Sequence, residues 1–175
     1  MDLDSADWQR QWTIDAGTLV LQPVTRDVAA TIRHGGTVTL EFEDGALHDR
    51  LGNAMDFAMR DIESGAAAVL PTVWLAVRRA DRRIVGDLGT HGPPDGEGSV
   101  EIGYSFAPSV RGQGIGSAAV GALVRRLSSV AAVHQITAVT GAGNVPSRRL
   151  LERLGFQVTD QLADSGEVRY ALAVG

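Results

Sequence analysis

The chain has 175 residues, the size of one domain, and hydrophobic residues make up 44% of it while charged residues make up 21%. These shares are typical of a folded globular protein, and they exclude a disordered chain and a membrane-spanning one. The net charge of -5 excludes the basic surface that a nucleic-acid partner requires, and the lack of cysteine excludes thiolate metal sites and an acyl-cysteine intermediate.

The first part of the chain combines one predicted strand with predicted helices. Residues 1–10 are acidic and lack the positively charged start and apolar run of a secretory signal, so we expect a cytoplasmic location. Branched residues predict a first strand over 18–22. Apolar residues at helical spacing predict one or two helices over 27–34 and 46–64, which we expect to cover one face of a sheet.

Strands dominate the middle of the sequence. Segments 73–78 and 84–89 flank a short polar turn and predict an antiparallel hairpin, and 91–98 is a loop by its glycine and proline content. Segment 99–106 alternates in side-chain character, which predicts a strand with two different faces. One face carries Val100, Ile102, Tyr104 and Phe106, and the other carries Glu101, Gly103 and Ser105.

Helices and strands alternate in the last third of the sequence. A glycine-rich loop over 112–116 leads into a predicted helix that extends to about residue 129. It is followed by a predicted strand over 135–140, a short helix over 146–154 and closing strands over 156–159 and 168–173. The sequence has no internal repeat and no linker long enough to divide it. Residues 1–175 are therefore expected to form a single domain of mixed α/β class.

Three glycines at every second position, Gly112, Gly114 and Gly116, stand where the first of these helices begins. Glycine lets the backbone approach a ligand without a side-chain clash, and the free amides of a first helical turn favour an anion. Arg111 beside them adds a charge-assisted contact to a phosphate. The pattern predicts a phosphate site, although the same glycines also suit a plain tight turn between a strand and a helix.

Two other kinds of phosphate site compete for this loop. A nucleotide-binding P-loop requires Gly-Lys followed by serine or threonine, but Gly116 precedes Ser117 with no lysine between them. Residues 114–119 fit the Gly-x-Gly-x-x-Ala form of the dinucleotide fingerprint, which needs an acidic residue about 20 positions later. Residues 120–151 contain no aspartate or glutamate, so a Rossmann-type oxidoreductase is the weaker alternative.

The motifs around the loop resemble a known family. Arg-Gly-Gln-Gly-Ile-Gly at 111–116 resembles the Arg/Gln-x-x-Gly-x-Gly/Ala signature of the GNAT superfamily of N-acetyltransferases. It follows Glu-Ile-Gly-Tyr at 101–104 and precedes both Asn-x-x-Ser at 144–147 and Leu-Leu-Glu-Arg-Leu-Gly-Phe at 150–156. This combination, which covers residues 73–156, is similar to the branch that acetylates the N-termini of ribosomal proteins.

The resemblance implies a fold and a cosubstrate. The expected fold is a mixed α/β domain with a central, mostly antiparallel sheet of about six to seven strands and about four helices. The sheet is expected to splay between its fourth and fifth strands, here 99–106 and 135–140, with the pantetheine arm of acetyl-CoA in the gap. No metal is implied. The implied cofactor-binding residues are Phe106, Ala107, Arg111, Gly112, Gln113, Gly114, Ile115, Gly116, Ser117, Asn144 and Ser147.

Acetyl transfer to an amine needs a base, because an alkylamine titrates near pH 10 and attacks only in its neutral form. Glu101 is the best-placed candidate, since it lies on the polar face of its strand near the residues that border the acetyl group. His91 and Glu97 in the preceding loop are lesser alternatives, and an ion pair with an arginine is the structural alternative for Glu101. The resemblance places the oxyanion-binding amide within 104–107.

The departing thiolate calls for a proton donor. Many family members have a tyrosine on the short helix, but the corresponding residue here is Leu151. Ser147 resembles the serine near the CoA sulfur in the ribosomal-protein branch, and its hydroxyl is the expected donor. Helix capping is the alternative role for both Ser147 and Asn144.

From these motifs we predict an acetyl-CoA-dependent N-acetyltransferase that acts on a primary amine by direct attack in a ternary complex, with Glu101 and Ser147 as catalytic residues. The lack of cysteine supports direct transfer. A non-catalytic acyl-CoA-binding or regulatory domain is the alternative from another class. A protein N-terminus, a polyamine and an aminoglycoside remain open as acceptors. Neither nucleic acid nor a membrane is expected as a partner, and homodimers are common among similar proteins.

Overall fold

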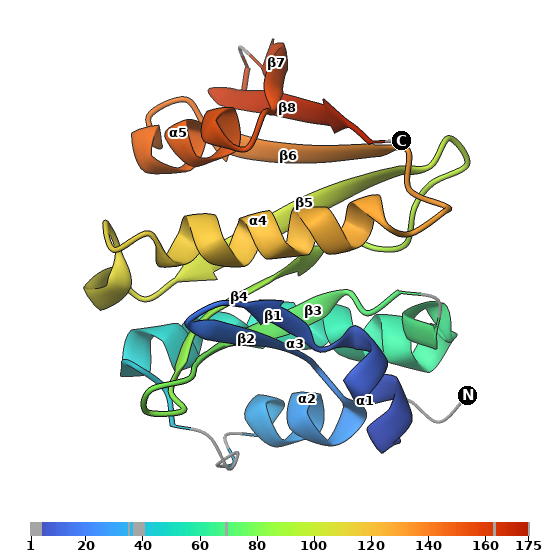
Figure 1. The fold of residues 1–175 in the computed structure, drawn as a ribbon, viewed down its shortest axis with the longest axis vertical. Coiled ribbons are helices and arrows are strands. Elements are labelled where there is room, and N and C mark those ends of the chain that lie inside the picture. Colours follow the sequence, from blue (N-terminus) through green and yellow to red (C-terminus); the bar gives the residue numbers. More distant parts are fainter. Residues whose placement is uncertain (1–4, 35, 37–40, 69, 163, 175) are drawn as a thin grey trace.

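The computed structural model describes residues 5–34, 36, 41–68, 70–162 and 164–174. Within them the chain forms a mixed α/β fold on an eight-stranded sheet (Figure 1), with the strand order β1-β2-β3-β4-β5-β6-β8-β7. The strands are β1 (Ile14–Ala16), β2 (Leu19–Pro23), β3 (Val73–Arg78), β4 (Ile84–Thr90), β5 (Ser99–Phe106), β6 (Gln135–Gly141), β7 (Gln157–Leu162) and β8 (Glu167–Ala173). The α-helices are α1 (Ala6–Trp12), α2 (Arg26–Arg33), α3 (Gly45–Ser64), α4 (Ile115–Ser128) and α5 (Val145–Arg153).

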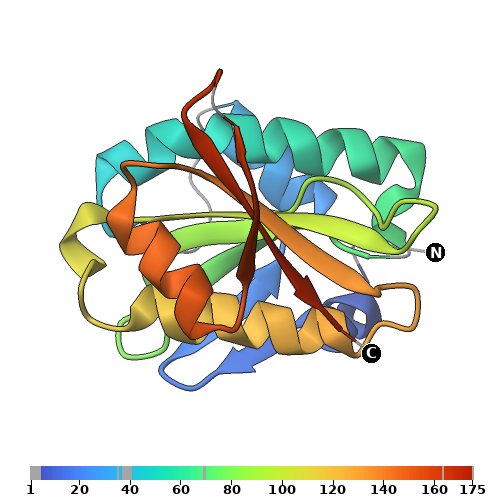
Figure 2. The ribbon, with the colours of Figure 1, turned by 90° about the horizontal axis from the view of Figure 1, so that it is seen from above.

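Helices cover both faces of the sheet (Figure 2). α2 and α3 pack against each other on one face, where α3 lies along β3 and β4. α4 lies on the opposite face with α1, since the guanidinium of Arg126 in α4 stacks over the ring of Trp12 in α1 at 4.3 Å. α4 connects β5 to β6, and these two strands pair in parallel, whereas the other neighbouring strands run antiparallel. The predicted class and the mostly antiparallel sheet are therefore confirmed.

The N-terminal elements α1 and β1 were not predicted. They bring the sheet to eight strands where six to seven were expected, and the described residues to five α-helices where about four were expected. Trp8 and Trp12 of α1 are buried, and the Trp12 carbonyl oxygen accepts a hydrogen bond of 2.8 Å from Nε1 of Trp74 in β3. A helix of 7 residues and a strand of 3 are too short to leave a readable period, so their tertiary contacts define them.

The sheet parts between β5 and β6, the two strands over which the splay was expected. Their pairing begins at Ser99 with Gln135 and ends at Ile102 with Ala138. Beyond that point β5 stays paired with β4 as far as Phe106, and β6 stays paired with β8. Because β1 precedes them, they are the fifth and sixth strands of the sheet and not the fourth and fifth. The two halves of the sheet diverge toward the ends that lead into α4 and α5.

Trp74→Phe should destabilise the fold more than Trp8→Phe does. Both side chains are buried, but the Trp74 indole N–H bonds to Trp12, whereas Nε1 of Trp8 has no hydrogen-bond partner among the described residues. The Trp74 variant leaves a buried oxygen unpaired, which costs about 1–3 kcal/mol beyond the packing loss that both variants share. Urea denaturation measures the difference, and equal free energies of unfolding for the two variants would contradict it.

Candidate functional site

The loop before α4 presents backbone N–H groups at a helix end. Gly112 and Gly114 have φ angles of 75° and 78°, in the left-handed region that glycine adopts without strain. Gly114 is the N-cap of α4, no side chain caps this end, and the first turn holds no acidic residue. The positive end of the helix dipole is therefore not neutralised from within the turn, an arrangement that favours binding of a phosphate.

The third glycine of the loop, Gly116, has a packing role. A Cβ atom at this position would lie 3.2 Å from Cδ1 of Leu150 in α5 and 3.4 Å from Cε2 of Phe106 in β5. These distances are shorter than ordinary van der Waals contact, so the missing side chain lets α4 approach both elements closely. Gln113 folds back onto the loop, where its Nε2 donates to the Ser109 carbonyl oxygen at 2.8 Å.

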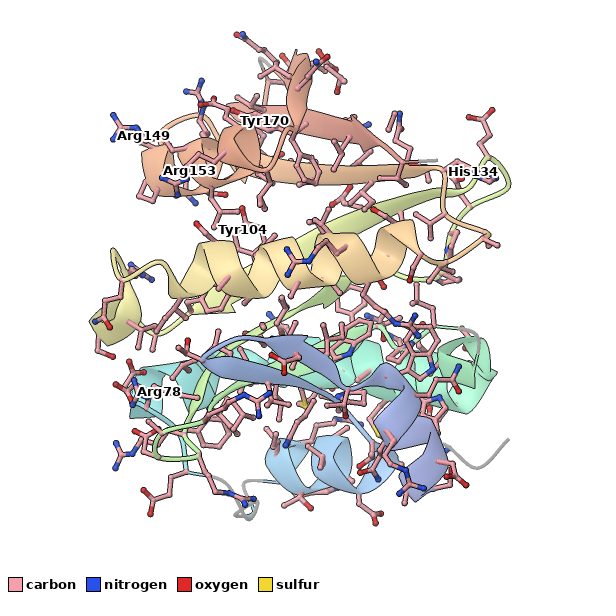
Figure 3. The ribbon with its side chains drawn as sticks, in the orientation of Figure 1. Arg78, Tyr104, His134, Arg149, Arg153 and Tyr170 are labelled. Atoms are coloured by element: carbon pink, nitrogen blue, oxygen red, sulfur yellow. The ribbon has the colours of Figure 1, made fainter. Side chains whose placement is uncertain are left out.

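Arginine side chains lie beside this loop. Arg111 is exposed within the loop, and Nη2 of Arg153 in α5 donates to Oγ of Ser117 in the first turn of α4 at 3.2 Å. Figure 3 shows Arg149 and Arg153 extending from α5 on the side where α4 begins. Arg153 was not predicted as a site residue. Its signal was the arginine-rich character of the predicted helix 146–154, and only the packing of α5 beside α4 brings this charge to the loop.

A hydrogen bond joins β5 to α5 across the place where the sheet parts. The hydroxyl groups of Tyr104, labelled in Figure 3, and Ser147 lie 2.9 Å apart, and either one can be the donor. Asn144 is the N-cap of α5, and its Oδ1 accepts from the backbone N–H of Ser147 at 3.3 Å. Asn144 thus has the capping role that the sequence left open, while the hydroxyl of Ser147 bonds to a side chain.

Tyr104 contributes a hydroxyl to the candidate site that was not predicted, because its position in the alternating strand assigned its side chain to the apolar face. Burial raises the pKa of its phenol above the ordinary value, and the hydrogen bond with Ser147 offsets part of that rise. A raised pKa keeps the phenol neutral, and therefore able to donate, at neutral pH. Leu151, at the position of the family's tyrosine, is fully buried in the core.

The α5 segment that carries Ser147 is held in place from β8. Tyr170 of β8 is fully buried, and its hydroxyl accepts from Nε of Arg148 at 3.1 Å and donates to Oε1 of Glu152 at 3.2 Å. A second nitrogen of Arg148 donates to the Ala142 carbonyl oxygen at 3.1 Å. These contacts fix the start of α5 relative to β6 and β8, and they position the Ser147 hydroxyl toward β5.

The end of β5 offers backbone groups to the gap. The N–H of Ala107 donates to the Val85 carbonyl oxygen of β4 at 2.9 Å. Because alternate residues of an antiparallel strand direct their backbone groups to opposite sides, the N–H groups of Tyr104 and Phe106 point toward the side that β6 has left. Of the four residues in which an oxyanion-binding amide was expected, Tyr104 and Phe106 present theirs to the gap, whereas the Ala107 N–H is already engaged.

The opposite face of the sheet holds a cavity of about 590 Å³ between β3, β4, β5 and α3. Part of its floor is bare backbone, because Gly89 of β4 pairs with Gly103 of β5. A Cβ atom at Gly89 would lie 1.9 Å from the Thr72 carbonyl oxygen, so this position requires glycine. Asn53 and Phe57 of α3 form part of the wall. The cavity is large enough for a small-molecule group or the end of a peptide.

Glu101 lies beside this cavity and bonds to His91. Oε1 of Glu101 is 2.9 Å from Nδ1 of His91, and the two side chains keep 34% and 51% of their exposure. The partner of Glu101 is thus a histidine, not the arginine of the structural alternative. The other alternative base, Glu97, is exposed and borders a separate hollow that it shares with His134.

The predicted residues fall into two groups on opposite faces of β5. Loop 111–117, Asn144 and Ser147 gather near Tyr104, where α4 and α5 begin. Glu101 lies with His91 on the face that α3 covers. The edge of β5 that β6 has left separates the two groups, and it is the place where ligands on the two faces would meet.

Residues 10–157 match the family described as Acetyltransferase (GNAT) domain. The chain belongs to the GNAT family. The general reaction of this family is the transfer of an acetyl group from acetyl-CoA. The glycine loop of this GNAT protein and its parted strands lie inside the matched region, so the family assignment rests on the same residues as the site.

Individual relatives of this GNAT protein include one curated protein and several solved structures. It is 34% identical over 91 residues to the uncharacterized N-acetyltransferase YjdG of Bacillus subtilis, a match that spans 52% of the chain and 54%, about half, of YjdG. The structure of Mycobacterium smegmatis RimJ in complex with CoA-disulfide is 26% identical, with a TM-score of 0.60 over 91% of this chain and 84% of that one. The ribosomal-protein-S5-alanine acetyltransferase of Vibrio fischeri shares the fold at 13% identity, with a TM-score of 0.65 over 92% of this chain and 96% of that one.

The described residues of this GNAT protein lack both a membrane-spanning helix and a cluster of potential metal ligands. No helix among them is long and apolar enough to cross a membrane. No three of their histidine, aspartate and glutamate side chains gather as a metal ion requires.

Ser147→Ala should raise the pKa of Tyr104 further, because it removes the hydrogen bond that lowers this pKa and leaves the burial that raises it. Because the pKa of Tyr104 is higher in the folded than in the unfolded protein, the neutral phenol contributes to the free energy of unfolding. That contribution is lost as the pH rises through the folded-state pKa. The carbon-13 shift of Tyr104 Cζ, followed by NMR across alkaline pH, measures the change. Ser128→Ala, remote on α4, is the control, and equal titration midpoints in the two variants would contradict the expectation.

Proposed function

We propose that this GNAT protein is an acetyl-CoA-dependent N-acetyltransferase that passes the acetyl group directly to a primary amine. The observation that carries the proposal is the parting of β5 from β6 between two unlike sites. One is a helix end suited to phosphate, and the other is a cavity beside a carboxylate and an imidazole. A phosphate-bearing thioester and an amine suit these two sites, and the reaction belongs to the single domain and the cytoplasmic setting expected from the sequence.

The phosphate end of CoA is assigned to the loop 111–117. The left-handed glycines, the uncapped start of α4 and the charges of Arg111 and Arg153 support this assignment. The amide groups of the pantetheine arm can replace β6 as hydrogen-bond partners of Tyr104 and Phe106, in the way that an added strand pairs with a free edge. The residues present therefore fit the cosubstrate at both its charged and its amide-bearing parts.

The chemistry divides between the two faces of β5. In this proposal the N–H of Tyr104 or Phe106 binds the oxyanion that forms when the amine adds to the thioester. The Tyr104 and Ser147 hydroxyls stabilise the departing thiolate by about 1.5–3 kcal/mol, the contribution of a hydrogen bond to a charged group. A thiol ordinarily titrates near pH 8.5, below a phenol whose pKa is raised by burial, so these hydroxyls donate a hydrogen bond and do not surrender a proton.

A non-catalytic acyl-CoA-binding domain is the second candidate, and Leu151 in place of the family's tyrosine is the observation that favours it. The Tyr104 hydroxyl weighs against it, because this group offers a phenol from β5 where α5 lacks one. The paired His91 and Glu101 weigh against it as well, because a domain that only binds acyl-CoA has no need of a base beside the acceptor cavity.

The function is tested by following free thiol while the protein is incubated with acetyl-CoA and an amine. An alanine-terminated peptide, spermidine and kanamycin represent a protein N-terminus, a polyamine and an aminoglycoside. We include the peptide because the Vibrio fischeri relative is named for an alanine of a ribosomal protein. Thiol release that depends on one of these amines, with no acetylated protein formed from acetyl-CoA alone, is the expected result. Binding of CoA without thiol release from any of them would favour the non-catalytic alternative.

Ser117→Asp should weaken CoA binding by at least about tenfold, equivalent to about 1.4 kcal/mol. An aspartate in the first turn suits the helix dipole and pairs with Arg153, so it adds repulsion to a phosphate while the fold stays intact. Ser117→Asn has a similar size and no charge, and it should bind CoA more tightly than the aspartate variant does. Titration calorimetry provides the comparison, together with melting temperatures. Equal affinities of the two variants for CoA would place the phosphates elsewhere.

A further inference from the structure

The backbone places His91 opposite Glu101 at the end of the β4–β5 ladder. The N–H of His91 donates to the Glu101 carbonyl oxygen at 2.8 Å, one residue beyond the pairing of Thr90 with Ile102. Residues opposite each other in an antiparallel pair carry their side chains on the same face of the sheet. Both side chains are therefore held on the cavity face by main-chain bonds, and this explains why Nδ1 of His91 meets Oε1 of Glu101 at 2.9 Å.

The carboxylate decides which nitrogen of His91 is free. An ionised carboxylate only accepts hydrogen bonds, so the proton of the neutral imidazole lies on Nδ1, which donates to Glu101. This leaves the lone pair of Nε2 available on the other side of the ring. The ring plane is fixed as well, because Phe57 of α3 stacks on it with a centroid separation of 5.8 Å and an interplanar angle of 17°.

The free nitrogen lies over a bare part of the cavity floor. A Cβ atom at Gly103 would lie only 2.8 Å from Nε2 of His91, so the ring tip occupies the space above that glycine. Gly103 directly precedes Tyr104, whose N–H points toward the gap where β6 has left β5. His91 and Gly103 line the cavity, whereas Glu101 is not among the described residues that line it. The imidazole thus lies between the carboxylate and the space open to an acceptor.

We propose that His91 is the catalytic base, and that Glu101 is a positioning residue that acts through the imidazole. This inference rests on the proposed transferase function and changes the role that the sequence suggested for Glu101. Histidine suits the task because an imidazole exchanges protons near neutral pH. Glu101 fixes the tautomer and stabilises the imidazolium that forms.

The step conserves protons and electron pairs. Nε2 of His91 takes one proton from the acceptor ammonium, and the neutral amine nitrogen then forms a bond to the thioester carbonyl carbon. When the carbon–sulfur bond breaks, its electron pair leaves with the CoA sulfur. The new amide nitrogen gives its extra proton to that thiolate, and the imidazolium, which is half-exposed, releases its proton to water. The products are the acetylated amine, CoA thiol and one proton.

The first test is His91→Ala, measured by thiol release with whichever of the alanine peptide, spermidine and kanamycin the wild type accepts. kcat should fall by about two to four orders of magnitude, the contribution of a positioned base, with unchanged affinity for CoA. Added imidazole should restore part of the rate by occupying the vacated space. His34→Ala is the matched control, because His34 is exposed at the end of α2 and is not among the described residues that line the cavity. Wild-type kcat in His91→Ala would overturn the proposal.

Glu101→Gln distinguishes positioning from direct catalysis. It should lower kcat by a smaller factor than His91→Ala and leave the KM for the amine nearly unchanged. In the His91→Ala background it should have little further effect, because residues that act as a unit are not additive. A larger loss for Glu101→Gln than for His91→Ala, without rescue by imidazole, would overturn the proposal and return the base role to Glu101.

Gly103→Ala provides a variant that keeps both titratable groups. The new methyl group meets only the His91 ring and no backbone atom, so the fold should survive while the displaced ring lowers kcat. Wild-type kcat in folded Gly103→Ala would overturn the placement of Nε2. If the wild type releases no thiol with any acceptor, the proposed function and this inference both fail. If the wild type is active and His91→Ala is equally active, only this inference fails.

Discussion

The parallel pairing of β5 with β6 stops after a few residues, and the geometry of the candidate site depends on that stop. β4 continues to pair with β5 on one side as far as Phe106, while the other edge of β5 loses its partner after Ile102. The crossover helix α4 connects the end of β5 to the start of β6. Its uncapped start therefore lies at the end of the sheet where β5 and β6 have parted. The arginine side chains, the free backbone N–H groups of β5 and the cavity beside His91 come close together there because one ladder ends early.

The alternation of β5 converts this gap into two chemically distinct sides. Side chains at successive positions point to opposite faces, so Tyr104 faces α5 while its neighbour Gly103 faces the cavity under α3. The Tyr104 hydroxyl beside α5 and the cavity surface at Gly103 therefore come from neighbouring residues and lie on opposite sides of one strand. In this arrangement, phosphate, hydroxyl and imidazole chemistry need not interfere with one another.

The sequence was informative where the spacing of apolar residues repeated over enough positions, or where glycine marked a special backbone conformation. The 20-residue helix α3, the alternating strand β5 and the left-handed glycines before α4 all follow from such patterns. The short α1 and β1 exist through tryptophan packing, which has no local signature. Tyr104 and Arg153 were overlooked because their roles depend on where α5 packs, a long-range fact. For Glu101 the strand face was predicted, but its partner His91 depends on how the preceding loop returns to β5.

The hydrogen bond between Tyr104 and Ser147 has a thermodynamic consequence for any molecule that enters between β5 and α5. These hydroxyls are already hydrogen-bonded to each other, so a ligand that bonds to either one replaces an existing hydrogen bond. Such an exchange contributes little net binding free energy. Most of the binding affinity must then come from the charged end of the gap at the start of α4. The Tyr104 and Ser147 hydroxyls contribute specificity. A molecule that binds the charged end but offers no hydrogen-bonding group to these two hydroxyls would leave the bond between Tyr104 and Ser147 intact. It would then occupy the site without engaging these hydroxyls.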